Sequence, residues 1–199
     1  MARRKGHVFF NVPFDAGYER LYVALISGLV TLGFAPHCSL EVPATRDRLS
    51  RIFALMRTCE YSIHDLSRVQ LSSASPRCPR FNMPFEAGLA FALFLTDKKQ
   101  HACAIFEAEN YRVQRTLSDL NGMDPYIHGE TVRGLSIALT DLFPVRGATA
   151  DALMSVYRKV SASARLVKAR NGNHLLRPSS YRQLVAISHD CAKAAGYVP

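Results

Sequence analysis

Glu86 is the charged side chain whose surroundings in the sequence point most directly to chemistry. It is the only charged residue between Arg80 and Asp97, in a stretch of Phe, Met, Ala, Gly and Leu. Burial of a lone carboxylate is costly unless the group is paired or protonated. One interpretation is an acid in the first turn of a helix, stabilised by the helix dipole. The other is a catalytic or ligand-contacting carboxylate that faces a cleft, where apolar walls would raise its pKa.

Further polar side chains follow segments that are predicted to be buried strands. Asn11 and Asp15 follow the first of these segments, and Asp65 and Ser67 follow the third. Ligands of an open parallel sheet collect at the carboxyl ends of its strands, so we expect these side chains to converge with Glu86 on one edge of the sheet. For Asp65 the alternative is a turn or capping acid.

Three basic side chains are further candidates for the site. His64 lies inside the strand that ends at Asp65, and the alternation of side chains along a strand favours a packed core histidine. Arg46 and Arg48 open a predicted helix. There they would either hold a phosphate or carboxylate or lie in a solvated first turn.

Several common active-site motifs are absent from the sequence. There is no GxGxxG after the first strand, no GxxxxGK[ST] and no GxSxG. The seven histidines show no HxxxH or HxH spacing, so we expect no metal site. The five cysteines form an odd set without a CxxC pair and are predicted to be reduced, mostly buried thiols.

The first 144 residues alternate strand-like and helix-like segments. This alternation, with apolar strands, predicts an α/β domain with a parallel sheet of about five strands and helices on both faces. The helix at 82–95 is apolar nearly all round and is expected to be buried, and the loop 67–80 is interpreted as either a lid or a flexible insertion. The predicted strands are 7–12, 35–40, 61–66, 101–106 and 125–128. The predicted helices are 18–32, 46–59, 82–95, 111–120 and 131–143.

Residues 145–199 differ from this domain in composition. They are predicted to form a helical annex with helices at 149–169 and 179–195, and they carry nine Lys or Arg residues against two acidic ones. Of the chain's formal net charge of +9, +7 therefore lies in the annex. Such a segment indicates a polyanionic partner or, more commonly, a solvated basic surface, so nucleic acid is the less favoured partner.

The 199 residues show no run of uncharged apolar residues long enough to span a membrane. The basic residues at the start are followed by an apolar stretch that Asn11, Pro13 and Asp15 interrupt, so no signal peptide fits. We therefore expect a cytoplasmic protein without a membrane partner.

Two motifs give the chain a family resemblance. One is a strand closed by Asp65-Leu66-Ser67, and the other is a helix start of the form Asn-x-x-x-Glu-x-Gly-x-Ala, here Asn82 to Ala90. Together they are similar to the nucleoside 2-deoxyribosyltransferase-like superfamily, which is related in layout to TIR domains. The chain resembles most closely a bacterial branch of similar size. The segments that carry the likeness are 11–15 (NVPFD), 65–68, 79–90 and 110–128.

The resemblance implies a flavodoxin-like sheet and a reaction at the anomeric carbon of an N-glycoside. Glu86 matches the position of the nucleophile, and Asp65 matches an acid that contacts the sugar or the base. The chain departs from the family in its first loop, which is NVPFD, and at Asn82, where the transferases carry an aspartate. These departures count against transfer between nucleosides and leave N-glycosidic cleavage and nucleotide binding as alternatives.

In the cleavage reaction Glu86 would stabilise an oxocarbenium-like state. Asp65 or Asp15 would hold sugar hydroxyls, and Asn11 or Asn82 would orient them. Ser67 would contact the substrate at the end of the third strand. Phe14, or alternatively Phe10 or Phe81, would stack on the base.

The resemblance also bears on partners and biology. NAD is a candidate substrate because TIR-related folds use it, no cofactor is expected, and bacterial stress response or antiphage defence is the implied role. A homo-oligomer is one admissible state. The alternative is a non-catalytic module that senses a nucleotide and docks a partner or nucleic acid through its basic tail.

Overall fold

A computed structural model describes residues 4–70, 78–96, 101–120 and 122–199 of the chain. Its centre is a five-stranded, all-parallel sheet with the order β2-β1-β3-β4-β5. This order is that of a flavodoxin-like fold, so the predicted fold class is confirmed. The strands are β1 (Arg4–Asn11), β2 (Ala35–Cys38), β3 (Cys59–Asp65), β4 (Ala102–Glu107) and β5 (Tyr126–Ile127).

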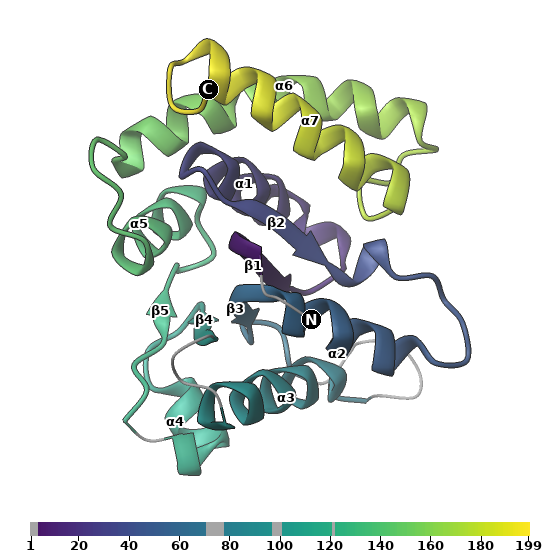
Figure 1. Cartoon of the computed structure of the whole chain (residues 1–199), viewed down its shortest axis with the longest axis vertical. Helices are drawn as coiled ribbons and strands as arrows, with labels where there is room; N and C mark the ends of the chain where they lie inside the picture. Colours follow the sequence, from purple (N-terminus) through teal and green to yellow (C-terminus); the bar gives the residue numbers. More distant parts are fainter. Residues whose placement is uncertain (1–3, 71–77, 97–100, 121) are drawn as a thin grey trace.

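Helices cover both faces of this sheet, as the alternation predicts. The helices α1 and α5 contact one another on one face, and α2 and α3 lie on the other, with α4 beyond β4 (Figure 1). The helices of the sheet domain are α1 (Glu19–Thr31), α2 (Arg48–Thr58), α3 (Asn82–Thr96), α4 (Arg112–Thr116) and α5 (Val132–Leu142). Short 3-10 turns are η1 (Ala16–Tyr18), η2 (Ser39–Glu41) and η3 (Ser118–Leu120).

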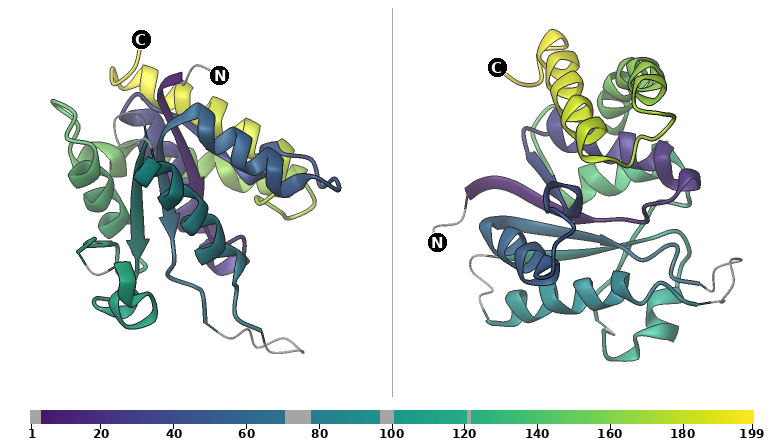
Figure 2. Two further views of the ribbon diagram at one scale, coloured as in Figure 1. Left: turned by 60° about the horizontal axis from the view of Figure 1, so that its bottom comes forward. Right: turned by 90° about the vertical axis from the view of Figure 1, so that its right-hand side faces the viewer.

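The C-terminal annex forms a second helical layer over α1. It consists of α6 (Ala150–Arg170) and α7 (Pro178–Ala194), which both pack on α1 on the side away from α2 and α3 (Figures 1 and 2). Its buried side chains Val156 and Leu184 belong to the same hydrophobic cluster as Val8 and Phe10 of β1. The annex and the sheet domain therefore share one core.

The contact between α1, α5 and α6 depends on a small residue in α1. A Cβ added at Gly28 would lie 2.6 Å from Leu139 Cδ1 of α5 and 3.4 Å from Leu153 Cδ2 of α6. A larger side chain at this position would require the Leu139 side chain to shift.

Two expectations about helices are wrong in detail. The helix α3 is not buried all round, because Phe85 and Leu95 are more than half exposed and only its Met83, Glu86, Ala87, Ala90 and Leu93 face the protein. Its high apolar content hides a one-sided burial pattern. The predicted helix 111–120 is divided into α4 and η3 because Leu117 leaves the helical conformation.

Two further predictions from the sequence concern the loop 67–80 and the burial of the cysteines. The predicted lid 67–80 includes 71–77, which lie outside the described residues. Of the cysteines, Cys38 and Cys59 are buried, Cys103 and Cys191 are partly buried and Cys78 is exposed, all with free thiols.

None of the helices in the described ranges combines the length and the apolar character that a bilayer crossing requires.

Candidate functional site

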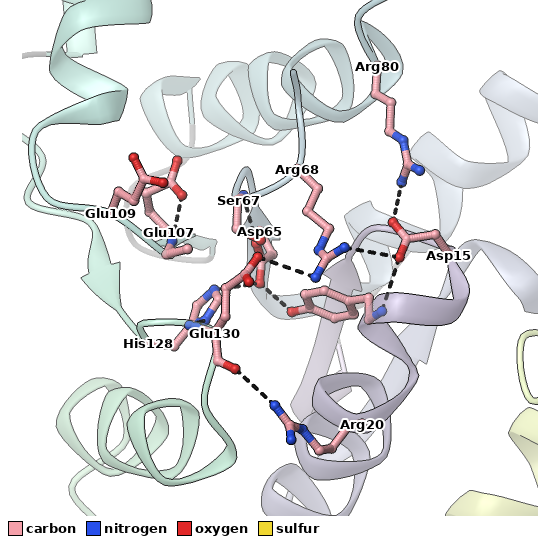
Figure 3. A network of polar contacts seen from close by, with 12 residues as sticks. Asp15, Arg20, Asp65, Ser67, Arg68, Arg80, Glu107, Glu109, His128 and Glu130 are labelled. Atoms are coloured by element: carbon pink, nitrogen blue, oxygen red, sulfur yellow. Dashed lines mark hydrogen bonds and ion pairs between the residues drawn. The ribbon is translucent and has the colours of Figure 1, made fainter. Parts of the chain in front are cut away.

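The carboxyl ends of the parallel strands carry a dense set of polar side chains. This is the edge at which the sequence places a ligand site, since the strand ends and the helix starts leave their polar groups there. The set draws on β1, β3, β4 and the segments after β5 (Figure 3). Its members are Asp15, Tyr18, Asp65, Ser67, Arg68, Arg80, Glu107, Arg112, His128 and Glu130.

Asp65 is the centre of this set and has only 1% of its surface exposed. Its carboxylate accepts a short hydrogen bond from the Tyr18 hydroxyl and one of 2.9 Å from the backbone N–H of Ser67. His128 Nε2 lies 3.1 Å from Asp65 Oδ2. Burial alone would raise the pKa of the Asp65 carboxyl, but the contacts with His128, Ser67 and Tyr18 outweigh it and lower the pKa. Asp65 is therefore ionised, and it connects Tyr18, Ser67 and His128.

The orientation of His128 fixes the proton that faces Asp65. The backbone N–H of Glu130 donates to His128 Nδ1 at 3.1 Å, so a neutral imidazole carries its proton on Nε2, toward Asp65. Burial and the neighbouring Asp65 raise the pKa of Tyr18, so its hydroxyl stays protonated as a donor. Tyr18 thus donates to Asp65, and His128 Nε2 lies at ion-pair distance from the same carboxylate without the geometry of a hydrogen bond.

Asp15 links the first strand loop to two arginines. Its side chain caps η1 by accepting the Tyr18 N–H at 3.0 Å. It also lies 2.8 Å from Arg80 Nη1 and 3.5 Å from Arg68 Nη1. The other terminal nitrogen of Arg68 lies 3.3 Å from Glu130 Oε1 (Figure 3). These ion pairs hold the guanidinium groups of Arg68 and Arg80 at the carboxyl edge of the sheet.

Glu107 and Arg112 form a second pair at the end of β4. Glu107 is buried and receives the Arg112 Nε at 3.0 Å on Oε2 as well as a short contact from Nη2 on Oε1. The same Nη2 donates to the carbonyl oxygen of Ser67 at 2.6 Å. Glu107 raises the pKa of Arg112 further, so this cation is permanent.

Four residues of this set were not predicted from the sequence, namely Tyr18, Glu107, Arg112 and His128. Glu107 directly follows a predicted strand and His128 is the last residue of another, so the rule that selected Asp65 applies to them equally. Tyr18 and Arg112 carry no comparable signal, because each opens a helix whose rotation about its axis the sequence leaves open.

Glu86 lies near the start of α3, outside the network around Asp65. It is 8% exposed, and its Oε2 is buried without a hydrogen-bond partner. Burial raises the pKa of Glu86 to about 7, and the charge of Arg48 offsets a part of this effect. Arg48 itself donates to the carbonyl oxygens of Val42 at 2.6 Å and Ser39 at 3.0 Å. A carboxyl that is half ionised near neutral pH is a functional-site feature.

Asn11 ties the end of β1 to the start of α3. Its Nδ2 donates to the Met83 carbonyl oxygen at 3.2 Å and lies 3.5 Å from His64 Nδ1. His64 is fully buried, as expected for a core histidine, and burial lowers its pKa to about 3. Asn11 therefore positions the helix that carries Glu86.

The remaining predicted site residues differ in exposure. Ser67 is 2% exposed with an unpartnered Oγ, and Asn82 is exposed at the first position of α3. Phe14 is half-buried and packs edge-to-face on Tyr22 with ring centroids 6.2 Å apart. Phe10 is fully buried in the core beneath α1, so it cannot stack on a base.

No protein-family model matches the chain, and neither a characterised protein nor a solved structure was found to match it. Across the described ranges, no three His, Cys, Asp or Glu side chains are grouped so that they could hold a metal ion.

Proposed function

We propose that this protein cleaves the N-glycosidic bond of a nucleotide or nucleoside, with Glu86 acting at the anomeric carbon. The observation that carries the proposal is the Glu86 carboxyl, which is buried, has an unpartnered oxygen and has a pKa raised to about 7. It is placed at the start of a helix that begins at the carboxyl edge of the sheet. The likeness to the deoxyribosyltransferase-like superfamily supports the same assignment.

The reaction requires a negative group at a carbon that becomes positive. Departure of the base generates an oxocarbenium-like sugar, and a carboxylate in a poorly solvated setting stabilises that charge more strongly than it would in water. Glu86 either stabilises the cation or captures it as a covalent intermediate that water then hydrolyses. Proton loss from Glu86 is favoured as the positive charge develops, because an opposite charge lowers the pKa of a carboxyl.

The polar set around Asp65 would bind the rest of the substrate. Asn82 and Asp15 reach the surface at the sheet edge and could meet sugar hydroxyls, while Asn11 holds the start of α3 in place. Phe14 offers an aromatic face beside the first loop. Cytoplasmic nucleotides, NAD among them, are the proposed substrates, and a role in bacterial defence follows from the family likeness alone.

A second candidate function is a module that binds a nucleotide without cleaving it. The observation that favours it is the state of Asp65, whose oxygens already contact Tyr18, Ser67 and His128. An acid engaged in this way stabilises the fold of the sheet edge, and with 1% of its surface exposed it does not reach a sugar.

Base release from a panel of nucleosides, nucleotides and NAD tests the proposal. The purified protein is incubated with each compound, and the free base is quantified by chromatography. We expect release by the wild type and a loss of at least a hundredfold in Glu86→Gln, with full activity in the control Glu60→Gln. Release that persists in Glu86→Gln would refute the role of Glu86. Binding without release by the wild type would select the sensing module.

A further inference from the structure

A hollow of about 390 Å3 opens at the carboxyl ends of β3 and β4, beside the network around Asp65. It lies between the segments that follow β3, β4 and β5. Two arginines and two exposed acids line it together with smaller polar groups. The residues that matter here are Ser67, Arg68, Gln70, Glu109, Arg112 and Glu130.

The two arginines are held in place from below. Arg112 is fixed by the buried carboxylate of Glu107 and by the carbonyl oxygen of Ser67. Arg68 is held by Asp15 on one terminal nitrogen. Their guanidinium groups therefore need little reordering to receive a ligand, which favours tight binding.

Two donors at this site lack an acceptor. The Oγ of Ser67 and the Nε of Arg68 are buried and make no hydrogen bond, and Ser67 as a whole is 98% buried. Buried donors are normally paired with protein or ligand acceptors. A ligand rich in oxygen acceptors would satisfy both of them.

The acids that face these arginines are exposed to solvent. Glu109 lies 3.3 Å from Arg112 Nη1 and is 69% exposed, and Glu130 lies 3.3 Å from Arg68 Nη2 and is 51% exposed. Exposed ion pairs of this kind contribute little, so a stronger anion can replace both carboxylates. Arginine forks match the oxygens of a phosphate group, and two of them converge here.

We propose that this hollow binds a phosphate group, so that the substrate is a nucleotide rather than a nucleoside. The assignment of the anion as part of a substrate rests on the proposed function. The arginine pair also extends through Asp15 to Arg80, which places positive charge along the path from the hollow to the start of α3. A nucleotide whose phosphate occupies the hollow would have its sugar directed along this edge.

Calorimetric titration with nucleosides and their 5′-monophosphates as matched pairs tests the proposal. We expect at least one monophosphate to bind about tenfold or more tightly than its nucleoside, and inorganic pyrophosphate to compete with it. Arg68→Gln should reduce the affinity for the monophosphate about tenfold and leave that for the nucleoside unchanged. Arg68→Lys should lose less, because it keeps the charge but not the fork.

Glu109→Gln is the counterpart, because it removes the competing carboxylate. It should raise the affinity for the monophosphate severalfold without an effect on the nucleoside. Melting curves of each variant establish that it is folded. Equal affinity for the two members of every pair, no binding of any phosphate compound, or equal losses for both members in Arg68→Gln would each overturn the hollow as a phosphate site.

The outcomes of this titration are separate from those of the base-release assay. Phosphate-dependent binding without base release would uphold the hollow and refute the glycosidase. Base release from nucleosides at the rate found for nucleotides would do the reverse.

Discussion

Glu86 makes the stability of the protein depend on pH. The direction of this dependence is opposite to that of an acid whose charge is stabilised by an ion pair. Its pKa is raised to about 7 in the folded chain, above the ordinary value near 4.5. The folded state then binds the proton more tightly than the unfolded chain does, so the free energy of unfolding falls as the pH rises from about 4.5 to about 7. The size of this effect is about 3 kcal/mol.

Glu86→Gln should abolish this dependence. At pH 8 we expect the variant to be about 3 kcal/mol more stable than the wild type, and at pH 4 nearly equal to it, because the neutral amide resembles the protonated acid. Urea unfolding at a series of pH values measures this, with Glu60→Gln as the control. Parallel curves for wild type and Glu86→Gln would show that the carboxyl is solvated or paired.

Asp65 has the opposite character, since its lowered pKa makes the charged form part of the fold. In Asp65→Asn the side-chain NH2 group would face the Tyr18 hydroxyl or His128 Nε2, which are themselves donors. We expect a loss of about 2 to 4 kcal/mol at pH 7. The loss should shrink as the pH falls through the folded pKa of Asp65, since the wild type then loses its charge as well.

Urea unfolding measures the effect of Asp65→Asn, with the exposed Asp190→Asn on α7 as the control. A change below about 0.5 kcal/mol would mean that the network around Asp65 does not stabilise the sheet edge.

The sequence allowed a part of this site to be predicted. Asp15, Asp65 and Ser67 follow strands, and the structure brings them to one edge through Arg68 and the Ser67 backbone. The hydrogen bond from the Tyr18 hydroxyl to Asp65 was not predictable from the sequence, because it joins residues 47 positions apart. Side-chain partners across such distances depend on helix rotation, which a single sequence does not encode locally.

The helix α5 approaches the end of β5 so closely that only glycine fits at Gly134. A Cβ there would overlap the carbonyl oxygen of His128 and lie 2.8 Å from Thr131 Oγ1, which caps the helix by accepting the Gly134 N–H. The close approach is what places His128 against Asp65. The geometry of the site thus depends on one backbone contact in another element.

Gly134→Ala should therefore destabilise the protein by about 3 kcal/mol, because rigid backbone must move. The matched control is Gly88→Ala on the exposed side of α3, where a Cβ meets open space. It should stabilise the protein by about 0.5 to 1 kcal/mol through helix propensity. Thermal unfolding of both variants measures the contrast, and a Gly134→Ala protein as stable as the wild type would contradict the close contact.

The boundaries of the elements were predictable because their periods and breakers agree. The strands β1 to β5 lie within a few residues of the predicted segments, and Gly33 and Pro144 lie just after the ends of α1 and α5. The exposed face of α3 was not predictable in the same way. Phe85 and Leu95 have the side chains of core residues, and nothing local shows that they face outward.

At the scale of the whole molecule, the annex carries most of the positive charge on the side away from its packed face. Arg158, Lys159, Arg165 and Arg177 are exposed, whereas Lys168 pairs with Glu19 of α1. If this surface binds nucleic acid, the affinity must fall steeply with salt, because bound phosphates release counterions. We expect weak binding at about 50 mM salt that is lost by about 200 mM. Micromolar binding that ignores salt would contradict an electrostatic contact.

The annex and the sheet domain should also unfold together. Leu184 of α7 is fully buried in the cluster that includes Phe10 of β1, and Tyr181 donates to the Pro36 carbonyl oxygen of β2 at 2.5 Å. Leu184→Ala removes core volume and should cost about 2 to 5 kcal/mol. Because the core is shared, the whole transition should move as one. Circular dichroism and tyrosine fluorescence should report the same shifted midpoint, whereas a second, unshifted transition would show that residues 1–144 fold independently of 145–199.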